Sequence, residues 1–199
     1  SSPIDVWSPR MDDYLNALCI ELRHIAKETE GKTLNTIYIG GGTPTTLTAK
    51  QLEKLLNVVD ELFLNEERGA ELLEYTVEAG RPDSITKEKL EVICRHPVTR
   101  ISVNPQTMQQ KTLDLVGRKH TVQAVKDIFH LARELGFDNI NMDLIAGLPG
   151  ENAEDMRDTL RQIEELSPDS LTVHSLAIKR AARMAQEQLV RDLHTEITE

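Results

Sequence analysis

The sequence is poor in the residues that nucleic-acid-binding surfaces need. Aromatic side chains make up 4% of its 199 residues, with a single tryptophan among them. So few aromatics leave few surfaces on which single-stranded bases can stack. The formal net charge of −10 also argues against a basic patch for phosphates. We therefore expect no nucleic-acid partner.

Cysteine is equally scarce. The two cysteines, Cys19 and Cys94, do not belong to a Cys-x-x-Cys or similar ligand spacing. Each lies in a helix-like pattern, so we expect buried structural thiols and a reducing, cytoplasmic location. The histidines at positions 24, 96, 120 and 130 also lack ligand spacing. We expect each of them to lie at the surface or to be satisfied by a neighbour, and we expect no metal site.

Long hydrophobic runs are missing as well. No apolar stretch approaches the roughly 20 residues of a membrane-spanning helix, and residues 1–10 lack the apolar core of a signal peptide. Hydrophobic residues make up 39% and charged residues 28% of the chain, which suits a core of ordinary size. We expect no membrane partner and a single domain over residues 1–199.

Three consecutive glycines form the most distinctive stretch that is present. Gly40–Gly42 follow Thr36–Ile39, a run of β-branched and aromatic residues typical of a buried strand. Thr48 and Gln51 then form a capping-box pattern that opens a helix. A strand, a glycine loop and a helix in this order form the layout in which α/β proteins bind ligands. A tight turn without a ligand fits the glycines equally well, and the stretch matches neither a P-loop nor G-x-G-x-x-G.

Strand-like and helix-like segments alternate along the rest of the chain. The further strands are expected at Glu74–Ala79, Arg100–Val103, Asn139–Ile145 and Ser170–His174. The helices are expected at Met11–Lys27, Thr48–Leu64, Thr86–Arg95, Lys111–Val116, Thr121–Leu135, Asn152–Leu166 and Lys179–Glu199. This alternation predicts right-handed βαβ units and a parallel sheet. A barrel, a partial barrel and a doubly wound open sheet all fit the periodicity.

Polar residues lie near the C-terminal end of every expected strand. They are Thr43, Glu78, Asn104, Gln106, Asp143, His174 and Ser175. Because the C-terminal ends of parallel strands meet at one edge, these residues predict one shared site. Asp143 stands between two apolar neighbours and needs a partner, for which Arg118 is a candidate. A purely structural ion pair between these two residues is the alternative.

Five motifs, in this order, resemble one known family. They are Gly40-Gly41-Gly42-Thr43-Pro44-Thr45, Val77-Glu78-Ala79, Arg100–Gln106, Gly117-Arg118-Lys119-His120 and Asn141–Gly150. Together they resemble the radical S-adenosylmethionine (SAM) proteins related to oxygen-independent coproporphyrinogen III oxidase, over about residues 11–180. The resemblance implies an α/β fold, a partial (β/α)6 TIM-like barrel of parallel strands.

The resemblance also implies a SAM site at the strand ends. It assigns the methionyl end of SAM to Gly41, Gly42, Thr43 and Arg118. It assigns the ribose and adenine to Glu78, Gln106, Asp143, Ile145 and Ala177. In such enzymes a [4Fe–4S] cluster reduces SAM, and the resulting 5′-deoxyadenosyl radical abstracts a substrate hydrogen. The resemblance identifies no catalytic side chain in this chain.

Two departures from the family pattern stand out. The chain has Asn104-Pro105-Gln106 where the family has Gly-Val-Gln, which indicates a divergent subgroup. The Cys-x-x-x-Cys-x-x-Cys loop that ligates the cluster, expected before Met11–Lys27, is missing. We therefore expect a truncated core fragment without the first barrel strand, which alone is inactive and binds no iron. Its exposed Thr36–Ile39 edge is then covered either by Ser1–Arg10 or by a second copy of the chain.

The leading expectation for the full-length protein is an oxidoreductase of haem biosynthesis. It would convert coproporphyrinogen III to protoporphyrinogen IX by anaerobic oxidative decarboxylation, with an electron donor for its cluster. Two alternatives remain: a radical SAM enzyme with another substrate, and a haem-binding chaperone without oxidase activity.

Overall fold

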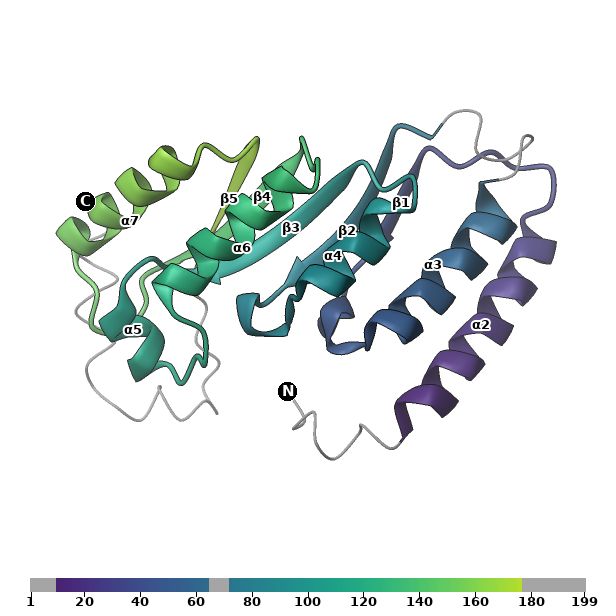
Figure 1. The fold of residues 1–199 in the computed structure, drawn as a ribbon, viewed down its shortest axis with the longest axis horizontal. Coiled ribbons are helices and arrows are strands. Elements are labelled where there is room, and N and C mark those ends of the chain that lie inside the picture. The colour runs from purple at the N-terminus through teal and green to yellow at the C-terminus, as the bar shows by residue number, and fades with distance from the viewer. Residues whose placement is uncertain (1–9, 65–71, 177–199) are drawn as a thin grey trace.

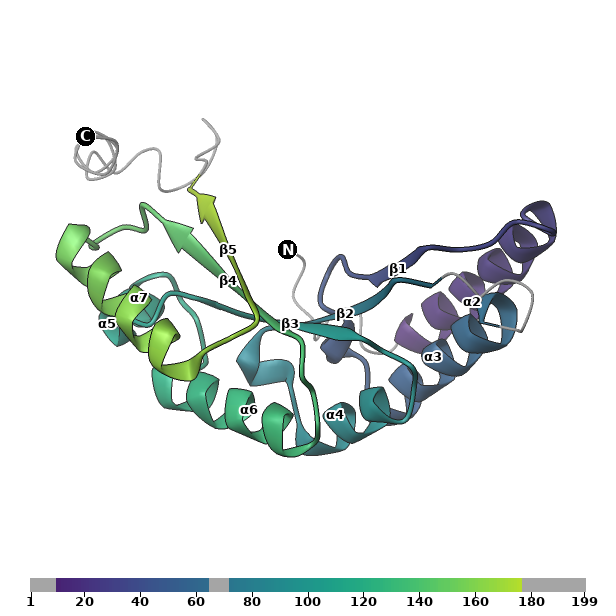
Figure 2. The same cartoon turned by 90° about the horizontal axis from the view of Figure 1, so that it is seen from above.

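The computed structural model describes residues 10–64 and 72–176, which form one parallel sheet with helices along one side. The strands are β1 (Thr36–Ile39), β2 (Glu74–Gly80), β3 (Arg100–Gln106), β4 (Ile140–Ala146) and β5 (Ser170–Ser175). They lie side by side in chain order, and every neighbouring pair is parallel. Figure 2 shows that the sheet curves into an open arc, as in a half-barrel.

The helices cover the convex side of this arc and leave the concave side open (Figures 1 and 2). They are α2 (Met11–Glu28), α3 (Ala49–Phe63), α4 (Lys87–Cys94), α5 (Gln110–Leu115), α6 (Val122–Glu134) and α7 (Ala153–Leu166), with short 3-10 turns η2 (Pro44–Thr46) and η3 (Pro82–Ser84). Local signals set their ends. Thr48 and Asn152 form the capping boxes of α3 and α7, and Gly136 follows α6 with a φ of +97°.

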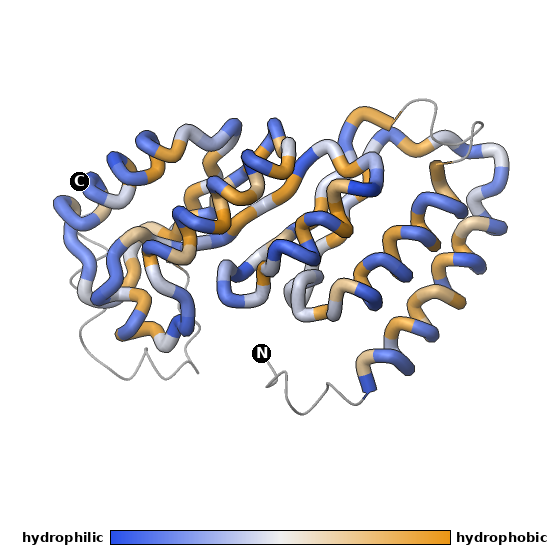
Figure 3. Tube along the Cα trace, in the orientation of Figure 1, coloured by the Kyte–Doolittle hydropathy of each residue, from blue (hydrophilic) through white to orange (hydrophobic). Residues whose placement is uncertain are grey.

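The two faces of the sheet differ in polarity because side chains alternate along each strand. Tyr75, Val77, Ile101, Met142 and Leu144 point to the helices and are fully buried. The helices alternate between hydrophilic and hydrophobic residues (Figure 3), and their buried apolar residues join those of the sheet in one core cluster. The core therefore lies between the sheet and its helices, and the concave face is left to polar side chains.

The strand β3 is longer than the sequence predicts. The sequence predicts a strand over Arg100–Val103, but the strand continues through Asn104-Pro105 to Gln106. Its register with β4 shifts between Val103 and Gln106, because two residues of β3, Asn104 and Pro105, oppose one residue of β4. Pro105 has no N–H to donate to a neighbouring strand, which suits such a bulge. Gln106 leaves the bulge with a φ of 73°, in the left-handed region that few residues other than glycine adopt.

The strand–helix alternation and the parallel sheet that the sequence predicts are confirmed. Cys19 is buried, but Cys94 is exposed, so the expectation of a second buried thiol is wrong. Cys94 lies in the last turn of α4, where its thiol donates to the Leu135 carbonyl. The expected helix Lys179–Glu199 and the expected cover by Ser1–Arg10 lie outside the described residues, apart from Arg10. No described helix is long and apolar enough to cross a membrane.

Candidate functional site

The glycine loop follows β1 and lies against the end of β2. A side chain at Gly40 would place its Cβ 2.2 Å from Cε1 of Tyr38 and 2.9 Å from Oε2 of Glu78. Gly41 adopts a φ of +110°, and its N–H donates to Glu78 Oε2 at 3.4 Å. The absence of side chains thus lets the loop backbone approach the carboxylate of Glu78.

A second set of contacts holds the following turn, η2, against the loop after β2. The Thr45 hydroxyl donates to the Ala79 carbonyl and lies 2.6 Å from the Ser84 hydroxyl. Lys89 Nζ donates to the carbonyl oxygens of Thr45 at 2.6 Å and Ser84 at 2.9 Å. Burial lowers the pKa of this lysine. The glycine loop is therefore fixed on a rigid base formed by β2 and α4.

A continuous chain of hydrogen bonds crosses the concave face from β2 to β4. Asn104 Nδ2 donates to Glu78 Oε1 at 3.0 Å, and Ser102 Oγ donates to Asn104 Oδ1 at 2.8 Å. Asn141 Nδ2 donates to Ser102 Oγ at 3.1 Å and to Asp143 Oδ1 at 2.6 Å. Two carboxylates on different strands, Glu78 and Asp143, are thereby held by one buried polar network.

The partner of Asp143 is therefore Asn141, and the expected pairing with Arg118 is wrong. Within residues 10–64 and 72–176, Asp143 and Arg118 form no ion pair. Asp143 and Asn141 are two residues apart in β4, so they share a face of the strand and their side chains meet. Ser170 and Thr172 on β5 donate to Asn141 Oδ1 at 2.9 Å and 3.2 Å, which satisfies the other end of its amide.

Arg118 lines a cavity of about 370 Å³ at the C-terminal ends of β3 and β4. The residues around it are Arg81, Gln106, Val116, Gly117, Arg118, Ile145, Leu148 and Leu176. Burial and the nearby Arg81 lower the pKa of Arg118, while Asp83 opposes this shift. Arg81 itself donates to Asp83 through Nε at 3.1 Å and Nη2 at 2.6 Å. The cavity is thus lined by the guanidinium of Arg81, which is paired with Asp83, by the half-buried guanidinium of Arg118, and by apolar side chains.

His120 supports the loop that carries Arg118. Its side chain is fully buried, and Nε2 lies 3.2 Å from the carbonyl oxygen of Pro105, directly before Gln106. Its Nδ1 makes no hydrogen bond with a described residue and lies 3.9 Å from Asp83 Oδ1. Burial lowers the pKa of His120. Because the Pro105 carbonyl can only accept, Nε2 is the donor in this hydrogen bond. His120 thereby joins the ends of β2 and β3 to the Arg118 loop.

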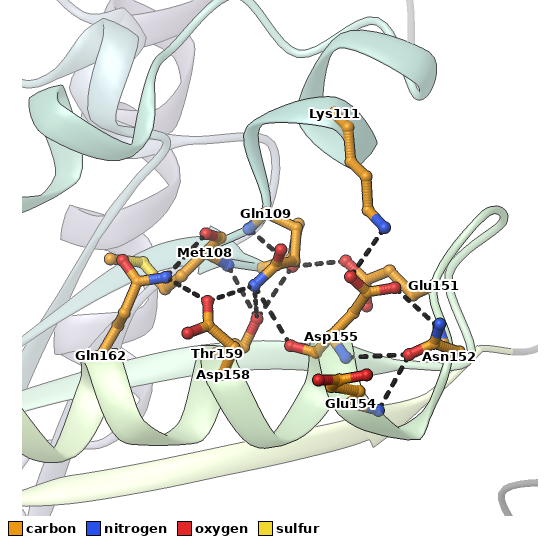
Figure 4. Close-up of polar contacts among 11 residues, drawn as sticks. Met108, Gln109, Lys111, Glu151, Asn152, Glu154, Asp155, Asp158, Thr159 and Gln162 are labelled. Atoms are coloured by element: carbon orange, nitrogen blue, oxygen red, sulfur yellow. Dashed lines mark hydrogen bonds and ion pairs between the residues drawn. The ribbon is translucent and has the colours of Figure 1, made fainter.

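A buried polar cluster joins the loop after β3 to the loop after β4 (Figure 4). Thr107, next to Gln106, donates to the carboxylate of Glu151 at 2.5 Å. Burial raises the pKa of Glu151, which is 3% exposed. Gln109 Nε2 donates to Asp158 Oδ2 at 2.8 Å, and Lys111 lies 2.7 Å from Asp155. The loop that positions Gln106 is thus attached to α7.

The nine residues assigned to SAM do not all line one cavity. Gln106, Arg118 and Ile145 line the cavity of about 370 Å³. Gly42 and Thr43 line a larger, mostly apolar cavity of about 630 Å³ between the glycine loop and α2. Glu78 connects to Gly41 directly and to Asp143 through the hydrogen-bonded chain. Ala177 lies outside the described residues.

Sequence reasoning missed several residues that shape this site. It did not single out Tyr38, Arg81, Ser102 or Asn141, and it treated His120 only as a surface or satisfied residue. The available signal was alternation: Ser102 lies two residues before Asn104, and Asn141 two residues before Asp143. Polar residues at every second position of a strand share one face, which predicts a polar concave surface.

The chain is similar to one large family of proteins over most of its length. A family model, Radical SAM superfamily, matches residues 12–163, which is most of the chain. The chain belongs to the radical SAM superfamily, and the resemblance drawn from its motifs is confirmed. This superfamily uses SAM together with a [4Fe–4S] cluster.

Particular relatives narrow the position within the superfamily. The chain is 44% identical over 182 residues to the oxygen-independent coproporphyrinogen-III oxidase-like protein HemZ of Bacillus subtilis, covering 90% of this chain and 36% of that protein. It is 36% identical over 174 residues to the heme chaperone HemW of Bacillus subtilis, covering 87% and 45%. Coproporphyrinogen III oxidase (HemN) from Escherichia coli has a similar structure, with a TM-score of 0.79 and 30% identity over 94% of this chain and 44% of that one. The expected partial barrel is confirmed, and the chain spans less than half the length of these relatives.

The donor set at the strand ends suits SAM, which carries a carboxylate, an ammonium, a sulfonium and a ribose diol. Glu78 and Asp143 can accept hydrogen bonds from hydroxyl or ammonium groups, and Arg118 can donate to a carboxylate. The [4Fe–4S] cluster has no comparable donor set here. Within residues 10–64 and 72–176, no group of three or more His, Cys, Asp or Glu side chains could hold a metal ion. None of the residues that the structure describes is therefore assigned to the cluster.

Proposed function

We propose that this chain is the SAM-binding core of a radical SAM oxidoreductase. The observation that carries this proposal is the presence of two carboxylates and one half-buried arginine around the C-terminal ends of β2–β4. Glu78 and Asp143 are joined through a hydrogen-bonded chain, and Arg118 lines the neighbouring cavity. A zwitterion with an attached ribose matches this combination of charges.

Each part of SAM has residues that would hold it. Arg118 would bind the methionyl carboxylate, and the backbone of Gly41 and Gly42 with the Thr43 hydroxyl would lie along the methionyl end. Glu78 and Asp143 would accept hydrogen bonds from the ribose hydroxyls.

Gln106, which lines the same cavity as Arg118, would also bind the ribose. Ile145 would pack on the adenine, as would Ala177. When bound, SAM and the cluster of the full-length protein supply the one-electron chemistry. This part of the chain would orient SAM and keep water from the buried base of the site.

For the reaction, we propose anaerobic oxidative decarboxylation of coproporphyrinogen III to protoporphyrinogen IX, with the cluster reduced by an external donor in the cytoplasm. The similarity to HemZ and to HemN supports this choice. The departure at Asn104-Pro105 leaves room for a radical SAM enzyme with another substrate. The proposal covers the full-length protein, because the chain spans less than half of these relatives.

A haem chaperone is the second candidate function. The 36% identity to the heme chaperone HemW supports it. Both candidates share the SAM-binding core, so the residues described above do not separate them. They differ in whether a porphyrinogen is converted or haem is only bound.

One experiment separates these functions. The full-length protein, with its cluster reconstituted, is incubated anaerobically with SAM, a reductant and coproporphyrinogen III, and in parallel is titrated with haem. The expected result is formation of protoporphyrinogen IX with consumption of SAM. Stable haem binding without conversion would favour the chaperone, and SAM turnover without either would point to another substrate. Absence of SAM binding would contradict the proposed core itself.

A further inference from the structure

We infer that Asn104 is a positioning residue that orients the Glu78 carboxylate toward the ribose of SAM. This role rests on the SAM binding proposed above and extends it to a residue at which the chain departs from the related motif. In place of a glycine, this chain has a side chain with both a donor and an acceptor.

The amide of Asn104 is fixed at both ends. Its Nδ2 donates to Glu78 Oε1 at 3.0 Å, and its Oδ1 accepts from Ser102 Oγ at 2.8 Å. Ser102 Oγ already accepts from Asn141 Nδ2 at 3.1 Å, so its own proton is directed to Asn104. This assignment of protons leaves the amide nitrogen facing Glu78, since the reversed amide would set two acceptors against each other. Asn104 is 8% exposed, so water does not replace these contacts.

The contacts of Glu78 differ between its two oxygens. Oε1 accepts the shorter bond from Asn104, while Oε2 accepts two longer bonds of 3.4 Å from the Tyr38 hydroxyl and the Gly41 N–H. A carboxylate offers about four lone-pair positions. Tyr38 is 64% exposed, so its hydroxyl can give way to a ligand. Asn104 thus holds one oxygen in place, and the other faces the ligand.

The backbone around Asn104 is rigid for reasons unconnected with SAM. The bulge at Asn104-Pro105 shifts the register between β3 and β4. The Pro105 carbonyl is bound by the buried His120, and the Pro105 ring restricts φ. A donor placed on such a segment loses little freedom when the ligand arrives, which favours binding.

The test measures binding of S-adenosylhomocysteine and SAM to the full-length protein by calorimetry. Asn104→Gly should weaken binding by about ten- to a hundredfold, the usual effect of a lost hydrogen bond to a charged group. Thr76→Val is the matched control. It removes a hydroxyl that donates to Glu74 on the same face of β2, without touching Glu78, and affinity should stay unchanged.

Asn104→Asp gives a readout that a merely structural role would not change. It replaces the donor with a second carboxylate facing Glu78, and two adjacent carboxylates share a proton with a raised pKa. The other charged groups that act on Tyr38, whose hydroxyl donates to Glu78, are Asp143 and Arg100. The variant should bind weakly at pH 8 and regain affinity toward pH 5.5, where one shared proton restores the hydrogen bond. The wild type should show a smaller change over this range.

The outcomes are distinct. Wild-type binding that Asn104→Gly weakens, together with the pH-dependent recovery of Asn104→Asp, supports the role of Asn104. Wild-type affinity in both variants at every pH overturns it, while the proposed SAM site stands. A wild type that binds neither compound overturns both. Thermal unfolding midpoints accompany each variant, and if Asn104→Gly does not fold, the pH profile of Asn104→Asp decides alone.

Discussion

At the scale of single residues, burial and pairing decide which charges are available to a ligand. Arg81 and Arg118 line the same cavity, but Arg81 already makes two hydrogen bonds to Asp83. Arg118 forms no ion pair with any residue in 10–64 and 72–176. Its half-buried guanidinium therefore gains more from an anionic ligand than Arg81 does.

Replacing Arg118 tests this directly. Arg118→Ala should weaken SAM binding to the full-length, cluster-loaded protein by about ten- to a hundredfold, or roughly 1.5–3 kcal/mol. Arg118→Lys keeps the charge but loses the planar guanidinium group. Its affinity for SAM should therefore lie between those of the wild type and Arg118→Ala. Arg95→Ala removes an exposed arginine paired with Glu53 at 2.8 Å and should leave calorimetric affinity unchanged. Equal affinities for Arg118→Ala and the wild type would contradict the assignment of Arg118.

The buried Glu151 should make the stability of the protein depend on pH. Burial raises the pKa of its carboxyl above the reference value of 4.5. As pH rises through the window between the unfolded and folded pKa values, the unfolded state ionises first, so this group lowers stability progressively. Glu151→Gln can still accept from Thr107 but does not titrate. The stability of the wild type relative to this variant should therefore fall as pH rises above about 4.5.

Urea unfolding at several pH values between 4.5 and 8 measures this difference. Glu154→Gln, at an exposed position in the first turn of α7, serves as the control for losing a carboxylate. A difference between wild type and Glu151→Gln that stays constant with pH would show that Glu151 titrates normally.

At the scale of elements, the site depends on the close approach of two loops. Gly80, at the end of β2, has a φ of +73°, and a Cβ on it would lie 2.8 Å from Cγ2 of Thr43. Thr43 belongs to the glycine loop after β1. The missing side chain of Gly80 in β2 therefore leaves room for the Thr43 side chain. This contact explains why β2 ends in a residue without a side chain.

A pair of glycine substitutions separates the cost of backbone strain at positive φ from the cost of the clash with Thr43. Gly80→Ala and Gly31→Ala both place alanine in the left-handed region, which costs roughly 1–2 kcal/mol. Gly31 has a φ of +75°, and a Cβ on it would have nothing within 4 Å, so it incurs only this cost. Gly80→Ala should lose a further ~1–3 kcal/mol because it pushes Thr43 aside. Urea unfolding of both variants measures the difference, and equal losses would show that Thr43 moves freely.

The edge strand β1 is the other element with a measurable consequence. Among the described residues it pairs with β2 alone, so one side of its backbone is left without a strand partner. Such an edge promotes association with a second chain. The 199-residue chain should therefore self-associate as its concentration rises in sedimentation velocity runs.

Charge on the edge should reduce this association. Thr36→Lys adds a lysine at an exposed position of β1, and Gln123→Lys adds the same charge on an exposed position of α6. The first should shift the chain toward monomer and the second should not. A wild-type chain that stays monomeric over the whole concentration range would rule out this use of the edge.

At the scale of the whole molecule, the described helices leave the concave side of the half-barrel open. All the described helices lie on the convex side (Figure 2), and the concave face carries the polar chain from Glu78 to Asp143. A polar, uncovered inner face is suited to a ligand that enters the arc. The donors needed for a metal cluster are not among the described residues.

This leads to a prediction for iron. After anaerobic reconstitution with iron and sulfide, the 199-residue chain should retain no stoichiometric iron, because a cluster needs several thiolates and the chain has two separated cysteines. Iron analysis and the visible absorption spectrum after desalting measure this. Iron at a fixed ratio, lost in the Cys19→Ser/Cys94→Ser double variant, would contradict the prediction.

The sequence by itself determined the order of the main helices and strands and most of their bounds. Alternation of period two identified the strands, and caps at Thr48 and Asn152 with the stop at Gly136 identified helix ends. These signals are local, because each depends on residues within one turn or one strand. The motifs likewise identified the superfamily, since the glycine loop and the strand-end residues occur at characteristic separations.

Only the tertiary structure decided which side chains meet. Asp143 is paired with Asn141, while Glu78 meets Asn104 from 26 residues away and Ser102 meets Asn141 from 39 residues away. The register of parallel strands sets such pairs, and the bulge at Asn104-Pro105 shifts that register in a way that propensities do not encode. The partners of the strand-end charges therefore follow from how the sheet assembles, because most of the partners are supplied by different strands.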